Sequence, residues 1–349
     1  MAALNEASPG AASAKVRKRL SVVSDNVLIE GLEKATLDSP ETQEGGPTII
    51  TEFFGRSEKG YAPYNPRKAN QDVFDSATDE ATGSLLLVVM DGHGEFGHKV
   101  SGFLKNIFSK TLFAEPSFAT DVPTALREAV RKSEAAMLKS NYQGGLGDQN
   151  EFSGTTFVAT VIRKNMLWCA NVGDSRLIVG VREDGRIVAK DVSEDHKPDA
   201  PLEKARIQAA GGRVFAVRYD DGVDGPARVW LAHADIPGLA MSRSLGDKVA
   251  HSAGVSSEPE IFELELAEGE HLFLVSASDG LWEFMTSQEV ADITAKYDSV
   301  EMAVNELIKE AKTRWLREEE VIDDTTVVVA CVGAWRGGES NNGSGAASS

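Results

Sequence analysis

Four short acidic motifs, each beside an apolar run with the composition of a β-strand, constrain this chain more than any other feature. They are Asp91-Gly92-His93-Gly94, Asn171 to Arg176, Ser278-Asp279-Gly280 and Asp323-Asp324. Carboxylates at strand ends can converge at one edge of a sheet while the strands themselves stay buried. Carboxylates brought together repel one another unless a cation lies between them. An all-oxygen cluster of this kind suits Mg²⁺ or Mn²⁺ rather than zinc.

The hydrophobic pattern predicts both strands and helices. Strands are expected at 85–90, 156–162, 166–171, 176–181, 271–277 and 326–332. Apolar stripes at helical spacing run from Val100 to Phe108, from Leu126 to Met137 and from Met302 to Ile308. Thr286 and Glu289 have the spacing of a capping box at the start of a further helix. Helices inserted after Asp91 and after Asp279 indicate sheets inside and helices outside.

The composition excludes several classes of protein. The formal net charge of -18 argues against nucleic-acid binding, because a phosphate backbone requires a basic surface. It fits a protein that binds metal cations or basic partners, and it also fits simple solubility. No apolar stretch approaches the length of a membrane span.

Targeting signals and cysteines indicate the compartment. The N-terminus has no signal-peptide pattern, and Ala2 stands where N-myristoylation requires glycine. Cys169 and Cys331 lie in apolar strand-like runs, so we expect buried thiols in a reducing compartment. These features predict a cytoplasmic protein. The basic cluster Lys15, Arg17, Lys18 and Arg19 leaves nuclear entry open, although a solvated or docking arm is the favoured interpretation.

The chain divides into three parts. Residues 1–48 have little periodicity and are expected to form a disordered arm, and residues 336–349 a disordered tail. Residues 49–335 form one domain without internal repeats. Within it, the polar, Gly/Pro-rich segment 213–238 is expected to be a long loop with little apolar surface. The calcium-loop spacing of an EF-hand is absent from this segment, so a calcium-binding regulator is not favoured.

Eight motifs occur in one order along the chain. They are Asp91 to Gly94, Ser153 to Thr156, Val172 to Arg176, Asp195 to Pro198, Ala209 to Val214, Met241 to Asp247, Glu258 to Glu260 and Ser278 to Trp282. Together they resemble the metal-dependent protein serine/threonine phosphatases of the PP2C (PPM) family, over about residues 53–332. The sequence around Lys68 to Asp72 and Arg228 to Leu231 is closer to plant and protist members than to animal ones.

The resemblance implies a fold and an activity. The fold is an α+β protein of the αββα sandwich type, with two packed antiparallel sheets flanked by helices and a flap beside the active site at about 213–238. The activity is hydrolysis of phosphoserine and phosphothreonine in phosphoprotein substrates by direct attack of a metal-activated water. The alternative is a phosphatase fold that has lost activity and serves as a scaffold. A docking partner would bind through the N-terminal arm or the flap.

The resemblance also implies a metal site with two ions, Mg²⁺ or Mn²⁺. Asp91 matches the residue that bridges both ions, and Gly92 matches one that gives a backbone carbonyl. Asp279 and Asp323 match ligands of the second ion, and Asp72 acts through water. Asp174 matches a residue that some members use for a third, weaker ion, with a turn residue as the equal alternative.

Two further residues match catalytic positions. His93 matches the general acid that protonates the departing serine or threonine oxygen. Arg67 matches the arginine that clamps the substrate phosphate, with Lys68 as the adjacent alternative.

Two positions depart from many relatives. Gln71 stands where a glutamate is common, which removes a charge. Asp324 stands where an asparagine is common, which adds a charge; Asp323 matches the ligand, with Asp324 as the adjacent alternative.

Overall fold

The computed structural model describes residues 48–139, 143–219 and 222–335, and the chain outside these ranges is not described. The expected N-terminal arm, with its basic cluster, therefore lies outside the described residues apart from Thr48. The expected tail at 336–349 lies wholly outside them. Both stay predictions.

The first sheet carries the strand that ends in the Asp91 motif. In spatial order it contains β12 (Leu245–Gly246), β4 (Gly154–Thr155), β3 (Ser84–His93), β5 (Phe157–Arg163), β6 (Met166–Val172) and β13 (Glu260–Glu265), with β2 (Asp72–Asp79) paired to β3. The paired strands of this sheet are antiparallel.

The second sheet carries the strands beside Asp279 and Asp323. In spatial order it contains β1 (Ile50–Glu58), β15 (Thr325–Val332), β14 (His271–Ala277), β7 (Arg176–Glu183) and β8 (Arg186–Asp191). It is also antiparallel. The two central strands, β14 and β15, are buried along their whole length, because both of their faces are covered.

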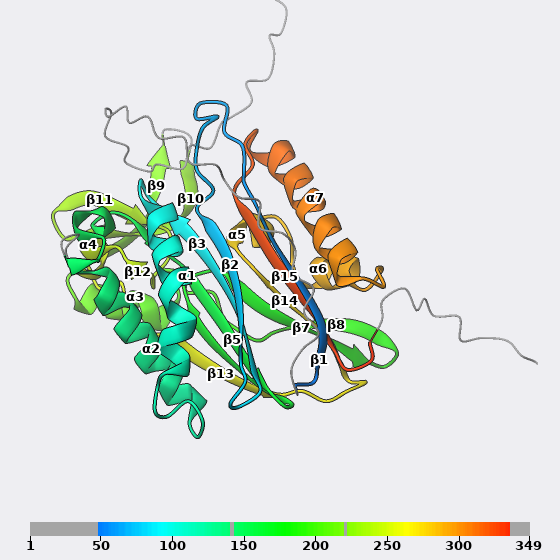
Figure 1. Ribbon diagram of the computed structural model, residues 1–349. Coiled ribbons are helices and arrows are strands. Elements are labelled where there is room, and N and C mark those ends of the chain that lie inside the picture. Colours follow the sequence, from blue (N-terminus) through cyan, green and yellow to red (C-terminus); the bar gives the residue numbers. More distant parts are fainter. Residues whose placement is uncertain (1–47, 140–142, 220–221, 336–349) are drawn as a thin grey trace, which may run out of the picture.

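The outer faces of the two sheets are covered by α1 (Gly97–Phe113), α2 (Val122–Met137), α5 (Asp279–Trp282), α6 (Ser287–Thr294) and α7 (Val300–Glu318). Two further helices, α3 (Pro201–Ala209) and α4 (Lys248–His251), pack against residues of the segment 213–239, and a 3-10 turn lies at Gly147–Asn150. Figure 1 shows α1 and α2 on one side and α6 and α7 on the other, with both sheets between them. This arrangement confirms the predicted αββα sandwich.

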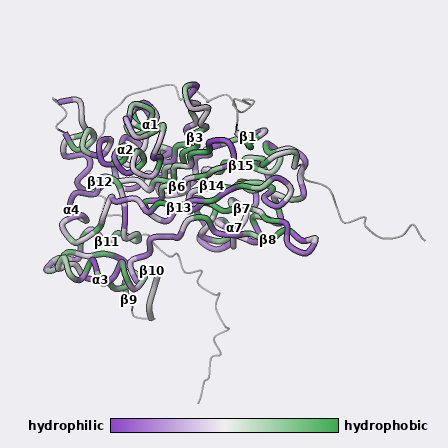
Figure 2. The backbone as a smooth tube through the Cα atoms, turned by 90° about the horizontal axis from the view of Figure 1, so that it is seen from below, coloured by the Kyte–Doolittle hydropathy of each residue, from purple (hydrophilic) through white to green (hydrophobic). Residues whose placement is uncertain are grey.

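Three apolar cores hold the four layers together. One lies between the first sheet and α1–α2, a second between the two sheets, and a third between the second sheet and α5–α7. In the first core, the rings of Phe108 and Phe157 meet edge to face with centroids 4.6 Å apart. In Figure 2 the green hydrophobic stretches gather around the packed strands. Both cysteines are buried and neither is part of a disulfide, as predicted.

Local sequence explains where the outer helices begin. Thr286 and Glu289 form the predicted capping box at the start of α6. Asp121 accepts a hydrogen bond from the backbone of Thr124, and Ser299 caps α7 in the same way. None of the helices in the described part of the chain is both long and apolar enough to cross a membrane.

The segment 213–238 is not the long loop that we expected. It forms a third sheet of β9 (Arg213–Tyr219), β10 (Gly222–Leu231) and β11 (Ala234–Leu239), which we call the flap. Val229 is fully buried and packs with Ile207 and Ala250, so this segment does bury apolar surface. In Figure 2 the flap strands project away from the layers. Only one face of the flap is covered, so polar residues on the open face interrupt the apolar pattern from which a strand would be predicted.

Candidate functional site

The carboxylates of the predicted metal site come from both sheets and meet at one end of the sandwich. Asp72 begins β2 and is paired in register with Asp91, near the end of β3. Asp279 starts α5 one residue after the end of β14, and Asp323 comes just before β15. These element ends all lie toward the upper end of the molecule in Figure 1. We call Asp72, Asp91, Asp279, Asp323 and Asp324 the acidic edge.

Ser278 joins the two sheets at the acidic edge. Its hydroxyl donates to Asp72 Oδ2 at 2.6 Å and accepts from the backbone nitrogen of Thr326 at 3.0 Å. The other oxygen, Asp72 Oδ1, is buried and has no hydrogen-bond partner among the described residues. A buried carboxylate oxygen without a partner is costly, so this atom indicates that the site takes a further ligand.

Burial and crowding raise the pKa of two carboxylates of the acidic edge. Burial, with the nearby Asp324, Asp323 and Asp279 carboxylates, raises the pKa of Asp72 to about 8 against the opposing hydrogen bond from Ser278. Burial also raises the pKa of Asp91 well above its ordinary value, and Asp72 and Asp279 add to this effect. These shifts arise because carboxylates are crowded in a region of low polarity.

Gly92 is confined by backbone on both sides. A Cβ atom there would lie 2.6 Å from the carbonyl oxygens of Gln71 and Gly97, so no side chain fits. A Cβ at Gly97 would in turn lie 3.0 Å from the Gly92 carbonyl oxygen. Glycine at both positions therefore lets the two backbone segments approach closely, and the role of the Gly92 carbonyl as a ligand stays a prediction.

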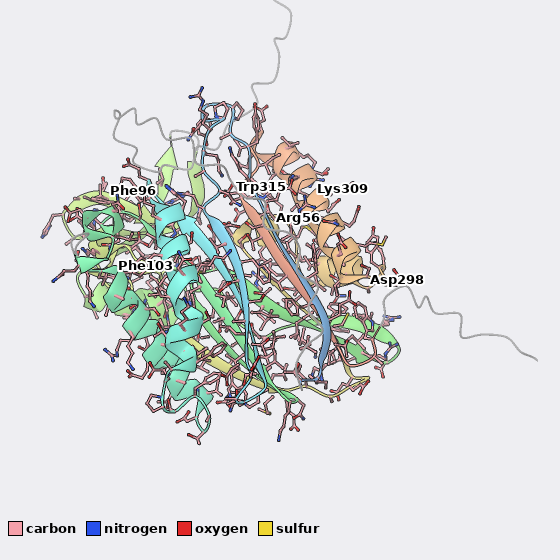
Figure 3. The ribbon with its side chains drawn as sticks, in the orientation of Figure 1. Arg56, Phe96, Phe103, Asp298, Lys309 and Trp315 are labelled. Atoms are coloured by element: carbon pink, nitrogen blue, oxygen red, sulfur yellow. The ribbon has the colours of Figure 1, made fainter. Side chains whose placement is uncertain are left out.

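Hydrogen bonds from Trp315 and Phe96 fix the chain near the acidic edge. Trp315 on α7 donates from its indole nitrogen to the Gly280 carbonyl at 2.7 Å, which fixes the turn after Asp279. The backbone nitrogen of Phe96 donates to the Ser153 hydroxyl at 2.9 Å, which fixes the chain after His93. Figure 3 shows these two residues on opposite sides of the sheets.

Asp323 and Asp324 have different surroundings. Asp324 is buried and accepts hydrogen bonds from the backbone nitrogens of Gly60 at 2.7 Å and Gln71 at 2.9 Å. Its carboxylate thus anchors the connection between β1 and β2. The Asp323 side chain is 25% exposed and accepts from the backbone nitrogen of Asp324. This contrast favours Asp323 as the accessible ligand of the pair.

His93 forms a close pair with Asp247. Its Nε2 lies 2.6 Å from Asp247 Oδ2, while Nδ1 is buried and has no hydrogen-bond partner among the described residues. Burial opposes a charged imidazole, but Asp247, with smaller contributions from Asp174 and Asp279, outweighs burial and raises the pKa of His93. The pair holds the ring by one nitrogen, and the role of His93 as general acid stays a prediction.

Asp247 is a site residue that the sequence analysis missed. It has a φ of 41°, in the left-handed region, and its backbone nitrogen donates to the Ser153 carbonyl at 3.0 Å. A Cβ at Gly154 would lie 2.1 Å from Asp247 Oδ2, so glycine makes room for the carboxylate. The sequence contains Asp247 in the motif Met241 to Asp247, which carries the family resemblance but does not indicate a role for this residue. The contact of Asp247 with a histidine 154 residues away depends on the tertiary fold.

Arg67 and Lys68 lie next to each other but differ in their contacts. Arg67 is exposed in the connection between β1 and β2. The Lys68 ammonium lies 3.1 Å from Asp324 Oδ1 and 3.4 Å from Asp323 Oδ1. Burial opposes the charge of Lys68, but the two carboxylates outweigh burial and raise its pKa. The phosphate-binding role of Arg67, with Lys68 as its alternative, stays a prediction.

Asp174 is already paired with a cation. Its Oδ2 accepts from Lys197 at 2.7 Å, while Oδ1 is buried and has no partner among the described residues. Burial opposes the charge of Lys197, but Asp174 and Asp195 outweigh burial and raise the pKa of Lys197. A third ion at Asp174 would have to compete with this lysine, and its binding there stays a prediction.

The donor set fits a hard divalent cation, although no cage exists in advance. Among the described residues, no group of three or more His, Cys, Asp and Glu side chains is arranged to hold an ion. Mg²⁺ commonly keeps several waters and needs few protein ligands, so a partial carboxylate set with an unpartnered Asp72 oxygen suits it. Ligation by Asp91, Gly92, Asp279, Asp323 and, through water, Asp72 stays a prediction.

Comparison with known families decides the relationship. The family model described as "Protein phosphatase 2C" matches residues 71–318, which is most of the chain. The chain belongs to the protein phosphatase 2C family. The predicted resemblance is thereby confirmed.

Plant members of the protein phosphatase 2C family are similar to the chain over most of its length. Probable protein phosphatase 2C 35 of Arabidopsis thaliana is 32% identical over 322 residues, covering 87% of this chain and 90% of that protein. Probable protein phosphatase 2C 45 of Oryza sativa subsp. japonica is 35% identical over 280 residues, covering 79% and 87%.

A solved protein phosphatase 2C structure has the same fold. The serine-threonine phosphatase 2C from Toxoplasma gondii matches with a TM-score of 0.69 at 20% identity, covering 84% of this chain and 99% of that one. A sex-determining protein of C. elegans matches with a TM-score of 0.63 and also 20% identity.

Membership in the protein phosphatase 2C family establishes the activity. The chain is a metal-dependent protein serine/threonine phosphatase, and its substrates are phosphoproteins. Retention of Asp91, His93, Asp279 and Asp323 favours this enzyme over the non-catalytic scaffold.

Proposed function

We propose that this phosphatase holds two Mg²⁺ or Mn²⁺ ions at the acidic edge. Asp91, the Gly92 carbonyl, Asp279 and Asp323 would be the protein ligands, and Asp72 would act through water. The observation that carries the proposal is the convergence of these carboxylates from both sheets, with Asp72 Oδ1 buried and without a partner among the described residues. When bound, such ions activate a water nucleophile and neutralise charge on the phosphoryl oxygens.

The residues around the ions have separate tasks. His93, held through Nε2 by Asp247, would donate a proton from Nδ1 to the departing serine or threonine oxygen. Arg67 would bind the phosphoryl oxygens with its planar guanidinium, which matches them in a bidentate way. Its exposed position lets it meet an incoming substrate. No covalent phosphoenzyme is expected, since an activated water attacks directly.

The flap is a candidate surface for protein substrates. Phe215 is 39% exposed, and its ring stacks on Trp230 with centroids 5.1 Å apart. Arg213 lies over the same ring, 5.2 Å from its centroid. An aromatic and cationic surface of this kind can contact a polypeptide chain. A small phosphate ester would reach the acidic edge without touching it.

The metal assignment is tested by chelation on a phosphothreonine peptide. Phosphate release should require added Mg²⁺ or Mn²⁺ and should stop in excess chelator. Asp91→Asn and Asp279→Asn should each reduce kcat by orders of magnitude while leaving the unfolding transition cooperative, since the ions stabilise charge in the transition state. Undiminished turnover after exhaustive chelation would contradict the two-ion site.

A further inference from the structure

Lys68 places a cation at the acidic edge. Its ammonium contacts both Asp323 and Asp324, at 3.4 Å and 3.1 Å. The Lys68 side chain is 20% exposed and that of Asp324 only 4% exposed. Charges shielded from water in this way interact more strongly than charges on an open surface. Lys68 therefore offsets part of the repulsion between the carboxylates.

The two contacts of Lys68 differ in how easily they break. Asp324 is fixed by the backbone nitrogens of Gly60 and Gln71, so its carboxylate stays in place whatever Lys68 does. The contact with Asp323 is longer, and the Asp323 side chain is the more exposed of the two. If a second cation needs one of these carboxylates, Asp323 is the one that Lys68 can release while it keeps Asp324.

We propose that Lys68 is a built-in counter-cation that competes with the catalytic divalent ion for Asp323 and thereby weakens metal binding. The inference deepens the proposed function and rests on its assignment of Asp323 as a ligand. An ammonium group and a divalent ion both require the oxygens of Asp323. The contact between Lys68 and Asp323 stabilises the metal-free site and must break when the ion binds Asp323, so it lowers the affinity for the ion.

The chain offers a matched control for this proposal. Lys59 lies in the same connection, is exposed, and contacts the Pro66 carbonyl at 3.3 Å instead of a carboxylate. Lys68→Met and Lys59→Met remove the same charge from the same connection, and methionine keeps an unbranched side chain. Only Lys68→Met removes the cation from the acidic edge. Lys68→Gln is a second variant in case Lys68→Met folds poorly.

The experiment measures Mn²⁺ binding to the metal-free full-length chain by calorimetric titration. Lys68→Met should bind Mn²⁺ with a Kd roughly fivefold lower than the parent, and Lys59→Met should match the parent. In chelator, Lys68→Met should unfold at a lower temperature than the parent, because the carboxylates lose their counter-cation. Saturating Mn²⁺ should therefore raise its unfolding temperature by more than it raises that of the parent.

The outcomes separate this inference from the proposed function. Equal Kd values for Lys68→Met and Lys59→Met would overturn the competition, as would weaker binding by Lys68→Met. Equal Kd values together with a raised KM for Lys68→Met would instead assign Lys68 to the phosphate. A parent chain that binds no Mn²⁺ would overturn the metal site itself, and this inference with it.

Discussion

The His93 ring is bonded through Nε2 to Asp247, whereas Nδ1 is buried without a hydrogen-bond partner in the described part of the chain. His93→Ala removes a proton donor, so turnover of phosphoserine peptides should fall on the order of 10²-fold. Turnover of p-nitrophenyl phosphate should fall little, because its leaving group needs little protonation. Steady-state kcat for both substrates measures this difference, and equal losses on both would exclude the general-acid role.

Asp247 should follow the same pattern through His93. Asp247→Asn keeps the size of the side chain but removes the charge that orients and stabilises a protonated imidazole. The expected loss is smaller than for His93→Ala, and it should again be larger for phosphoserine than for p-nitrophenyl phosphate. In the double variant the two losses should not add, since both act through one proton. Additive losses would show that Asp247 acts independently of His93.

The neighbours Asp323 and Asp324 should separate activity from stability. Asp323→Asn should lower kcat strongly and leave the free energy of unfolding nearly unchanged. Asp324→Asn should be milder in kcat but should lower the stability, because Asp324 accepts from the backbone nitrogens of Gly60 and Gln71. Urea unfolding and kcat measured on both variants give the comparison. If Asp324→Asn costs more kcat, the ligand is Asp324.

At the scale of elements, the flap should select among protein substrates. Phe215→Ala removes an exposed ring that stacks on Trp230, so the ratio of kcat/KM for two phosphoproteins should change. Turnover of p-nitrophenyl phosphate should stay within a few-fold of the parent. Leu202→Ala removes a side chain that is 85% exposed on α3, and it serves as the control. An unchanged ratio would mean that the flap does not contact these substrates.

The strands that the sequence did not predict lie at the edges of the sheets or in the flap. Both faces of β3, β14 and β15 are covered, so their apolar runs were evident from the sequence. In contrast, β1, β2, β8 and β13 lie at sheet edges, where polar residues are tolerated and interrupt the apolar pattern. The flap strands were missed for a related reason, since one of their faces remains open.

The acidic motifs could be predicted because each is local, with carboxylate, glycine and strand adjacent in sequence. The contacts of Asp247 with His93 and of Lys68 with Asp323 could not, because they join residues 154 and 255 positions apart. The periodic spacing of apolar residues gives no information about such pairs. The helix starts were predictable for the same reason as the motifs, since Thr286 and Glu289 lie within one turn.

At the scale of the whole molecule, Glu203 should govern acid stability. Burial opposes its charge, but hydrogen bonds from Arg243, Arg206 and Ser242 outweigh burial and lower its pKa to about 2 from the ordinary 4.5. A lowered pKa contributes stability that is present above the ordinary value and is lost as the pH falls from there toward about 2. Glu203→Gln should therefore cost roughly 1.5–3 kcal/mol near neutral pH.

Urea unfolding of parent and Glu203→Gln across that pH window measures this contribution. The difference between the two should shrink as the solution becomes more acidic. Glu128→Gln, which disrupts an exposed pair with Arg131, is the control and should change stability little at any pH. A difference that stays constant down to the acid limit would assign the loss to packing instead of charge.

Ser278 joins two separately hydrogen-bonded sheets, through the Asp72 carboxylate of the first and the Thr326 backbone nitrogen of the second. Backbone pairing fixes distances within each sheet, whereas the distance between the sheets is set largely by the apolar side chains packed between them. The spacing of the carboxylates at the acidic edge therefore depends on the thickness of this apolar core. A methyl group gained or lost at Leu87 or Leu274 would change the separation of the two sheets and thereby the spacing of the carboxylates. Substitutions in the interior can therefore alter catalysis while every polar group stays the same.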